Sequence, residues 1–306
     1  MATTTPDRAT ILKGPAKLVW NSATILFGDD FTVDMVTEFF DVQSSAHGRI
    51  GRRVKDRRIE ITGVPLMWDM LTAIFPYASA NIGDTLFGAT DKPAVITPRN
   101  GAPLTVANVM PTKLPGITLH PSKSIMRSMT FTGLVANSSD PSLQASFFSF
   151  GTVGSNVALT GLDLTKIPNA FYTASLNAVT YRPVDGFDID FNLGLEPDYD
   201  NGLTINQRIT SLEAACKFTP GPHTEAVIAT LLGWGGKQPG DEAPNYALTI
   251  SGDATGKPTV ALANMMVVGG GVRYGRAPRA GEITLESTRQ VSAGNLTALW
   301  TFSTVP

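Results

Sequence analysis

The sequence has little of the chemistry used by enzymes and by disulfide-rich proteins. Its 306 residues include one cysteine, Cys216, and three histidines, His47, His120 and His223. A single cysteine cannot form an intrachain disulfide, and this usage fits assembly in a reducing compartment best. The histidines have no i, i+4 partner and no cysteine nearby, so we interpret them as surface or turn residues and not as zinc ligands.

Long apolar runs and charged residues are also scarce. No run of eighteen apolar residues occurs, and residues 1–15 lack the charged-then-apolar pattern of a leader, so we expect neither a membrane span nor a secretory signal. Charged residues make up 16% of the chain, against 29 glycines and 21 prolines. This composition is rich in turns and poor in solvated helices, and it favours β structure. The hydrophobic fraction of 42% is enough for a folded core.

A long polar hairpin at residues 31–65 is the most prominent feature that is present. Apolar and polar side chains alternate in FTVDM at residues 31–35, which predicts a half-buried strand. Residues 50–63 complete the hairpin as the return strand, which Pro65 ends. The apolar parity slips within this return strand, because Ile50 and Val54 are even-numbered whereas Ile59 and Ile61 are odd-numbered. One extra residue turns every later side chain to the opposite face, so the slip predicts a β-bulge.

The same order of features returns 155 or 156 residues later. The matched pairs are Asn21 with Asn177, Phe31 with Phe187, Asp34 with Asp190, Ile50 with Ile205, Val54 with Ile209, Pro65 with Pro220, and Asn108 with Asn264. The parity slip recurs, and the amphipathic helix expected at residues 66–77 is matched at residues 224–232. We therefore predict a mainly β (α+β) fold made of two tandem β-sandwich domains, residues 1–159 and 160–306. Each has one flanking helix and one long hairpin, and residues 160–169 link them.

Three stretches resemble ligand sites, and each has a simpler interpretation. Residues 196–202 (EPDYDNG) have the carboxylate spacing of a calcium loop but lack its closing glutamate. Residues 269–271 (GGG) lack the G-x-G-x-x-G spacing of a phosphate cradle. Trp234 lies between glycines and is interpreted as an anchor at a helix end. Cys216 lies on the apolar parity of its strand, which indicates a buried structural thiol. We predict no catalytic residue, no metal and no cofactor.

Charge is distributed unevenly between the two halves. Residues 1–155 contain 14 Lys and Arg against 12 Asp and Glu, and residues 156–306 contain 10 against 14. The residues that carry this contrast are Arg49, Arg52, Arg53, Lys55, Arg57 and Arg58 in the first hairpin, and Glu196, Asp198 and Asp200 in the second. Three interpretations are open. The two sets are solvated loop tips, or they meet across a boundary between copies where opposite charge fixes register, or the basic hairpin binds nucleic acid.

The motif FTVDM, the long polar hairpin after it, the single helix and the further strands together resemble the tail tube proteins of long-tailed bacteriophages, which are kin to the inner-tube proteins of contractile injection systems. With two copies in one chain, the sequence is similar to the duplicated members of that family. The resemblance implies a structural virion protein of the tail, assembled in the host cytoplasm. Three chains would form a pseudo-hexameric ring, and stacked rings would form a tube.

The resemblance also implies the partners. These are other copies of the chain, the tape-measure protein, the tail terminator and tail tip proteins, and DNA that passes without specific binding. The basic hairpin residues are then expected at interfaces and not free in the lumen, because each lysine or arginine that contacts phosphate adds affinity for DNA. The alternative is a two-module β-sandwich protein that binds carbohydrate or acts as an adhesin, with Trp234 and residues 196–202 as its site.

Overall fold

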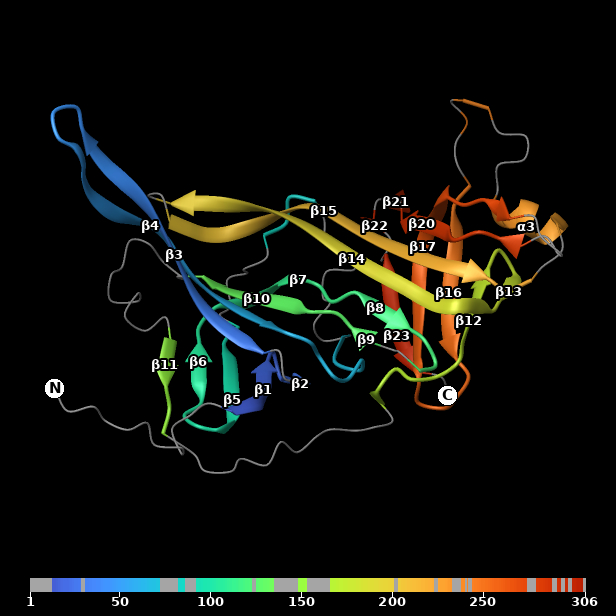
Figure 1. Cartoon of the computed structure of the whole chain (residues 1–306), viewed down its shortest axis with the longest axis horizontal. Helices are drawn as coiled ribbons and strands as arrows, with labels where there is room; N and C mark the ends of the chain where they lie inside the picture. The colour runs from blue at the N-terminus through green and yellow to red at the C-terminus, as the bar shows by residue number, and fades with distance from the viewer. Residues whose placement is uncertain are drawn as a thin grey trace.

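A computed structural model gives the fold of this chain. The described residues are 13–28, 31–71, 82–85, 92–122, 125–134, 148–152, 166–200, 203–222, 225–232, 238–239, 241, 244–273, 279–287, 291–292, 295–296 and 299–304. Antiparallel strands dominate this part of the chain, so the predicted mainly β class is confirmed (Figure 1).

The first half forms short strands around one long hairpin. Its strands are β1 (Lys13–Trp20), β2 (Ala23–Leu26), β3 (Thr32–Ser44), β4 (Gly48–Gly63), β5 (Ala94–Asn100), β6 (Leu104–Val106), β7 (Val109–Lys113), β8 (Ile117–Leu119), β9 (Ile125–Met126), β10 (Met129–Leu134) and β11 (Phe148–Phe150). We call the hairpin of β3 and β4 the arm, because it extends well beyond the rest of the molecule (Figure 1).

The second half has the same plan with longer strands. Its elements are β12 (Tyr172–Leu176), β13 (Val179–Tyr181), β14 (Pro183–Asp200), β15 (Leu203–Pro220), α3 (Glu225–Leu232), β16 (Tyr246–Gly252), β17 (Pro258–Gly269), β18 (Val272–Arg273), β19 (Arg279–Ala280), β20 (Ile283–Ser287), β21 (Val291–Ser292), β22 (Asn295–Leu296) and β23 (Trp300–Thr304). Helix α3 confirms the helix predicted at residues 224–232. The helix predicted at 66–77 is wrong in its first part, because residues 66–70 form bends and a turn and only Leu71 is helical; residues 72–77 lie outside the described residues. Among those that are described, no helix has the length and apolar character needed to cross a membrane.

Both halves use the same strand pairings. In the first half β1 pairs with β2 and β5, β6 pairs with β5 and β11, and β10 pairs with β7 and β4. In the second half β12 pairs with β13 and β16, β17 pairs with β16 and β23, and β20 pairs with β17 and β15. The two halves therefore share one order of strand pairings, as the predicted repeat requires. Its boundary between residues 159 and 160 lies outside the described residues and stays a prediction.

The first hairpin of each half turns through left-handed residues. Asn21 and Ser22 have φ of 47° and 65°, and Asn177 and Ala178 have φ of 49° and 60°. A two-residue turn with positive φ at both positions matches the twist of the strands it joins, and asparagine tolerates this conformation better than most residues. Asn21 and Asn177, which the sequence comparison matched, thus lie in the same kind of turn.

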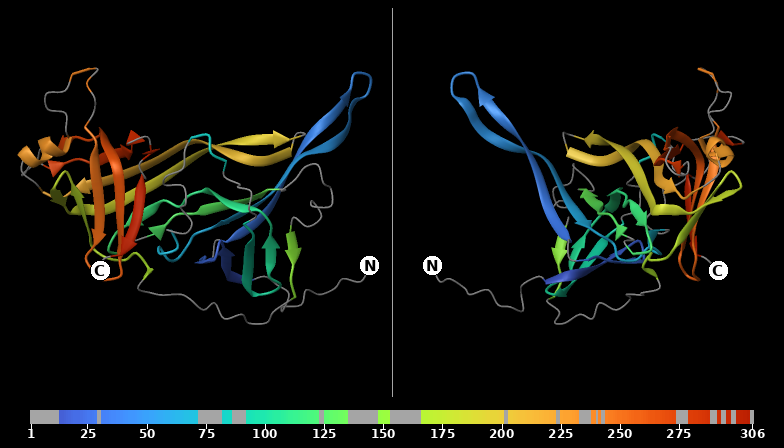
Figure 2. Two further views of the ribbon diagram at one scale, coloured as in Figure 1. Left: turned by 180° about the vertical axis from the view of Figure 1, so that it is seen from behind. Right: turned by 45° about the vertical axis from the view of Figure 1, so that its right-hand side comes forward.

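The predicted bulges are also present in both long hairpins. The register of β3 and β4 shifts at Lys55, and that of β14 and β15 shifts at Thr210, which is the residue 155 positions later. A second shift occurs at Ile50 and, by the same offset, at Ile205. Each bulge turns the outer part of its hairpin relative to the base; the arm rises away from the body, whereas the second hairpin runs along it (Figure 2).

The two halves share one hydrophobic core, although they repeat the same plan. Buried side chains from both halves form a single cluster, which includes Trp20, Phe131, Phe187 and Trp300. Trp20 donates its Nε1 hydrogen to the Val109 carbonyl oxygen over 2.6 Å, which satisfies this polar atom in the core. The largest sheet also contains strands of both halves, because β8 and β9 join its edge at β14.

Candidate assembly surfaces

The junction between the halves begins where β8 adds to the edge of β14. Ile117 lies opposite Ile189, and Leu119 lies opposite Phe187. All four of these side chains are almost completely buried. The first half therefore supplies a strand that extends the sheet of the second half, and apolar burial across the seam stabilises the contact.

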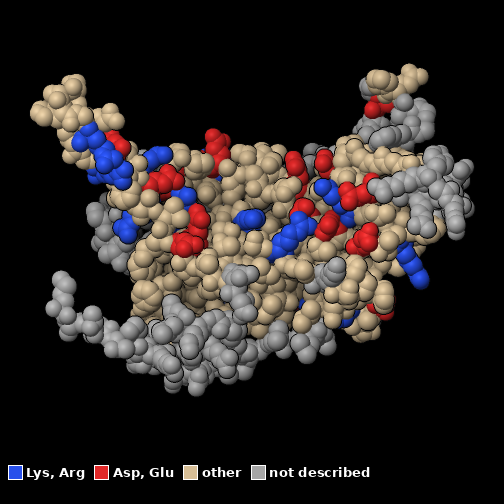
Figure 3. All heavy atoms as spheres, in the orientation of Figure 1, with Lys and Arg blue, Asp and Glu red and all other residues tan. Residues whose placement is uncertain are grey.

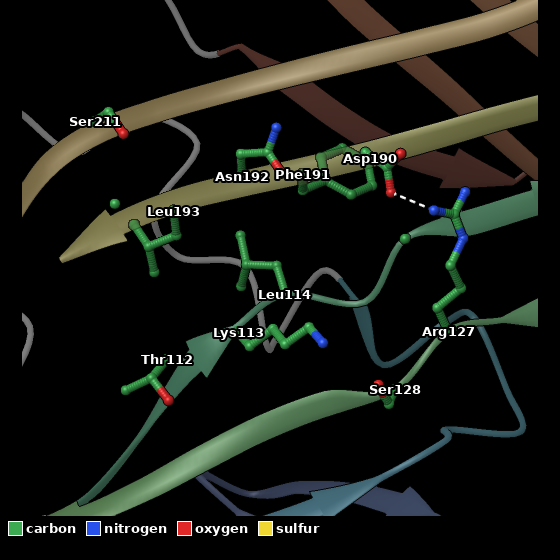
Figure 4. A pocket seen from close by; sticks show the side chains of 12 residues that line it. Thr112, Lys113, Leu114, Arg127, Ser128, Asp190, Phe191, Asn192, Leu193 and Ser211 are labelled. Atoms are coloured by element: carbon green, nitrogen blue, oxygen red, sulfur yellow. Dashed lines mark hydrogen bonds and ion pairs between the residues drawn. The ribbon is translucent and has the colours of Figure 1, made fainter.

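An ion pair closes the same junction beside a cavity. Arg127 donates to Asp190 over 2.6 Å and to Asp188 over 3.2 Å (Figure 4). The neighbouring cavity, of about 450 Å³, is also lined by Lys113 and Phe191. These groups remain partly exposed, so each pair contributes at most about 1 kcal/mol. Arg127 and Asp190 neutralise each other's charge. The arrangement therefore fits a contact between the two halves better than a reaction centre.

A short loop of the first half crosses β15 at a second contact, which we call the clamp. Gly83 N donates to the Ile209 carbonyl oxygen over 2.7 Å, and Ile209 N donates to the Asp84 carbonyl oxygen over 2.9 Å. Thr85 forms an isolated β-bridge with Arg208. The Ile209 side chain is only 1% exposed. The clamp thus holds the long second hairpin by its backbone at the position next to the Thr210 bulge.

A third contact places the end of the second hairpin against the arm. Thr204 N donates to Asp56 Oδ1 over 3.3 Å, and Asp56 is only 4% exposed. This carboxylate also accepts from Arg57 N and from Arg58. A buried carboxylate needs such partners because desolvation penalises its charge. Asp56 therefore ties the middle of the arm to β15.

Two strand edges that correspond to the β8–β14 junction have no strand paired with them among the described residues. In the described part of the chain, β3 pairs only with β4, so its outer edge has no strand against it. The hairpin of β18 and β19 likewise pairs with no other described strand. Met35 on β3 is 58% exposed, whereas its counterpart Phe191 on β14 is 4% exposed. An uncovered strand edge of this length exposes backbone N–H and C=O groups that can pair with a strand of another molecule.

The arm also carries an unusual number of exposed apolar side chains. They are Met35, Phe39, Phe40, Ile50 and Val54, each 46% exposed or more. Exposed apolar groups that gather on one element mark an interaction surface more often than scattered ones do. Because the arm projects from the body (Figure 1), this surface is accessible to another molecule.

The basic residues predicted as a contact set are partly neutralised by the arm itself. Arg49 and Arg52 lie 3.6 and 3.0 Å from Asp41, and Lys55 lies 3.5 Å from Glu38. The sequence interpretation considered the six cations of the return strand and overlooked the carboxylates of β3, which cross-strand pairing brings opposite them. Red atoms accordingly lie beside the blue group on the arm (Figure 3), which is less basic than expected.

Arg58 is the most strongly held of these cations. It bonds to Glu38 over 2.9 Å, to Asp56 over 3.2 Å and to Glu60 over 2.8 Å. Burial alone would lower the pKa of Arg58, but these carboxylates outweigh burial and raise the pKa above its usual range. The hydrogen bond from Arg58 in turn lowers the pKa of Glu38, and Lys55 adds to that effect.

The remaining two cations and the acidic set behave differently. Arg53 and Arg57 form no ion pair with a described residue, and both are exposed. Glu196, Asp198 and Asp200 were expected in a loop, but they belong to the last residues of β14. Asp198 pairs with Arg208 of its own hairpin over 3.1 Å. Within the described residues of one chain, no ion pair joins the basic and acidic sets. Their use as contacts between subunits stays a prediction.

Among the described residues, the other candidates form no reactive arrangement. His47 lies in the turn of the arm, and His120 accepts a hydrogen bond from Ser122 N over 3.1 Å. Cys216 is fully buried, as predicted, and burial raises the pKa of its thiol above the usual range. His223 and Trp234 lie outside the described residues. Gly269 ends β17, so it does not open a phosphate-binding turn.

Metal and family comparisons add no further site. Among the described residues, no group of three or more His, Cys, Asp or Glu is placed to hold a metal ion. No protein-family model and no curated protein matches the chain. The function is therefore inferred from the geometry of the molecule itself.

Proposed function

We propose that this protein is a structural subunit of a bacteriophage tail tube, and that it assembles head to tail through its open sheet edges. The observation that carries the proposal is the junction of β8 with β14. This junction joins one copy of the repeated plan to the next, while the equivalent acceptor, β3, and the equivalent donor, the β18–β19 hairpin, are both uncovered among the described residues.

The donor hairpins of the two halves have the same construction. Arg127 N donates to the Gly116 carbonyl oxygen over 2.8 Å, and Gly281 N donates to the Gly271 carbonyl oxygen over 2.7 Å. A Cβ on Gly116 would lie 2.6 Å from Asp190 Oδ1 and 3.1 Å from the Ile189 carbonyl oxygen, so glycine favours the close approach to β14 there. Gly271 has open space among the described atoms. A glycine where space is free is explained if a neighbouring β3, with Asp34 in the place of Asp190, packs against it.

Head-to-tail pairing of this kind is heterologous, so it gives a ring when the rotation closes. Val272 would lie opposite Val33 of the next chain, as Ile117 lies opposite Ile189 within the chain. Six copies of the plan then correspond to three chains. Ring closure removes every open edge except those used for stacking. Stacked rings would enclose the tape-measure protein and later conduct DNA.

This function needs no catalysed reaction. It needs an inner tube surface with low affinity for DNA. Ion pairs within the arm reduce its positive charge, and each cation withdrawn from phosphate lowers affinity for DNA. The alternative of a carbohydrate-binding or adhesin module has less support, because Glu196, Asp198 and Asp200 lie in a strand and not in a loop.

Gly271→Val tests the proposal directly. The substitution is expected to leave the chain folded, because a Cβ at Gly271 would meet no described atom within 4 Å, and to block strand addition. Negative-stain electron microscopy should show rings or tubes for the wild-type protein and none for the variant. Ala254→Val, at an exposed turn, is the control and should assemble normally. A wild-type protein that stays monomeric at high concentration, or tubes formed by Gly271→Val, would contradict the proposal.

A further inference from the structure

We propose that the loop containing Asp241 clamps the arm of a second copy of this chain at Val54 and Arg53. This inference rests on the proposed head-to-tail assembly. It adds a second contact to the pairing of β18 with β3, made by a different loop and to a different strand.

The precedent is the clamp within the chain. There, a loop of the first half exchanges two backbone hydrogen bonds with Ile209 and bridges Arg208 through Thr85. Backbone hydrogen bonds of this kind depend on the path of the target strand and little on its side chains. Any strand with the same path and the same bulge offers the same groups.

The arm provides such a strand. Arg53 and Val54 lie 155 residues before Arg208 and Ile209, and each pair is followed by the extra residue of a bulge, Lys55 or Thr210. Two features of the target are thus repeated: the arginine, and the bulge that orients the strand.

The clamping loop has a counterpart as well. The loop of the clamp precedes β5 and contains Gly83 and Asp84, and the loop between α3 and β16 contains Gly240 and Asp241. Gln238 N donates to Asp241 Oδ2 over 2.9 Å, and Asp241 N donates to the Gln238 carbonyl oxygen over 3.0 Å, which forms a turn. Gln238, Pro239 and Asp241 are all exposed.

Exposure indicates that the counterpart target is vacant in a single chain. Ile209 is 1% exposed, whereas Val54 is 46% exposed. Helix α3, which precedes the Asp241 loop, lies at the opposite end of the molecule from the arm (Figures 1 and 2). One chain cannot bring the two together, so the occupant must come from another copy.

Charge favours the same match. Arg53 forms no ion pair with a described residue, and the loop carries the exposed carboxylate of Asp241. Opposite charges across a contact favour the correct partner and speed association. The contact would therefore give Arg53 the anionic partner that its own hairpin does not supply.

Disulfide trapping tests the proposed contact between the Asp241 loop and the arm of a second copy. Val54→Cys with Asp241→Cys should form covalent dimers and trimers on oxidation, seen on non-reducing gels, and native Cys216 is too buried to interfere. Asp84→Cys with Ile209→Cys, the equivalent pair within one chain, should close without joining chains. Val54→Cys with Ala254→Cys is the negative control, because Ala254 lies on an exposed turn outside the clamp.

A charge exchange gives a second measurement that does not depend on disulfide geometry. Arg53→Glu should raise the protein concentration needed for assembly roughly tenfold, because like charges then face each other. Adding Asp241→Arg to that variant should restore assembly. Light scattering over a concentration series measures both.

The outcomes separate this inference from the proposed function. The contact between the Asp241 loop and the arm is wrong if tubes form, no Val54–Asp241 cross-link appears and Asp241→Arg does not restore assembly of Arg53→Glu. That result leaves the tube proposal unaffected. A wild-type chain that remains monomeric overturns both. Cross-linked trimers without tubes support the clamp and contradict the tube.

Discussion

Strands β3 and β14 occupy corresponding positions in the two halves, but their outer edges are covered differently. Both begin long hairpins with bulges at matched residues. The edge of β14 is covered by β8 of the same chain, and Phe191 is 4% exposed; among the described residues nothing pairs with the edge of β3, and Met35 is 58% exposed. The difference indicates that one contact forms within the chain, and that its repeat is left for a neighbour.

Truncation at the two matched positions should separate stability from assembly, and it has the largest expected effect. The Phe191 ring lies 5.0 Å from that of Trp300 and 5.7 Å from that of Phe302. Phe191→Ala is therefore expected to cost about 3–5 kcal/mol of unfolding free energy. Met35→Ala should change monomer stability by no more than about 0.5 kcal/mol, but it should weaken assembly.

Urea denaturation followed by tryptophan fluorescence measures the first effect, and sedimentation velocity measures the second. Equal losses of stability at the two positions would mean that the Met35 side chain is already packed in the monomer. That result would remove the contrast on which the assembly proposal depends.

A second pair of substitutions tests whether the halves share backbone conformation as well as pairing. Asn108 and Asn264 have φ of 47° and 52°. Alanine in this left-handed region costs about 1–2 kcal/mol, whereas glycine tolerates it. Alanine at either position should lower the urea midpoint by similar amounts, and glycine should lower it less. A loss at only one of the two would show that the repeat is looser than the pairings suggest.

Acidification should loosen the arm, with the smallest effect of the series. The pKa of Glu38 lies below its ordinary value near 4.5, mainly because Arg58 donates a hydrogen bond to it. A carboxylate with a lowered pKa contributes stability above its unfolded pKa and loses it as pH falls through the folded one. The urea midpoint of the wild type should therefore fall below about pH 4.5 more steeply than that of Glu38→Gln. Identical pH profiles would show that this ion pair contributes nothing.

Much of the local plan could be predicted from residues alone. The apolar parity slips between Val54 and Ile59 and again between Ile209 and Leu212, and bulges lie at Lys55 and Thr210. Parity works here because side chains alternate strictly along a strand, so a slip in parity indicates an inserted residue. The left-handed turn at Asn21 was predictable for a similar reason, since it is specified by adjacent residues.

The charge interpretation was less successful, because ion pairing depends on which strands lie opposite. Counting charges along residues 49–58 made the return strand of the arm look strongly basic. Strand pairing places Asp41 opposite Arg52 and Glu38 opposite Asp56, which brings both acids within reach of the cations. The Gly-Asp dipeptides at residues 83–84 and 240–241 are a sequence signal for the clamp. The signal can be interpreted only after the structure shows that residues 83–84 form backbone hydrogen bonds with Ile209.

The sequence by itself determined the β class, the repeat, the turns and the bulges, because these follow from the spacing of neighbouring side chains. Only the tertiary structure decided that the first half completes the edge of the second through β8, that a loop clamps β15, and that the arm neutralises much of its own charge. Those features join residues far apart in the chain. They depend on which of several equivalent edges is filled, and that choice leaves no periodic pattern in the sequence.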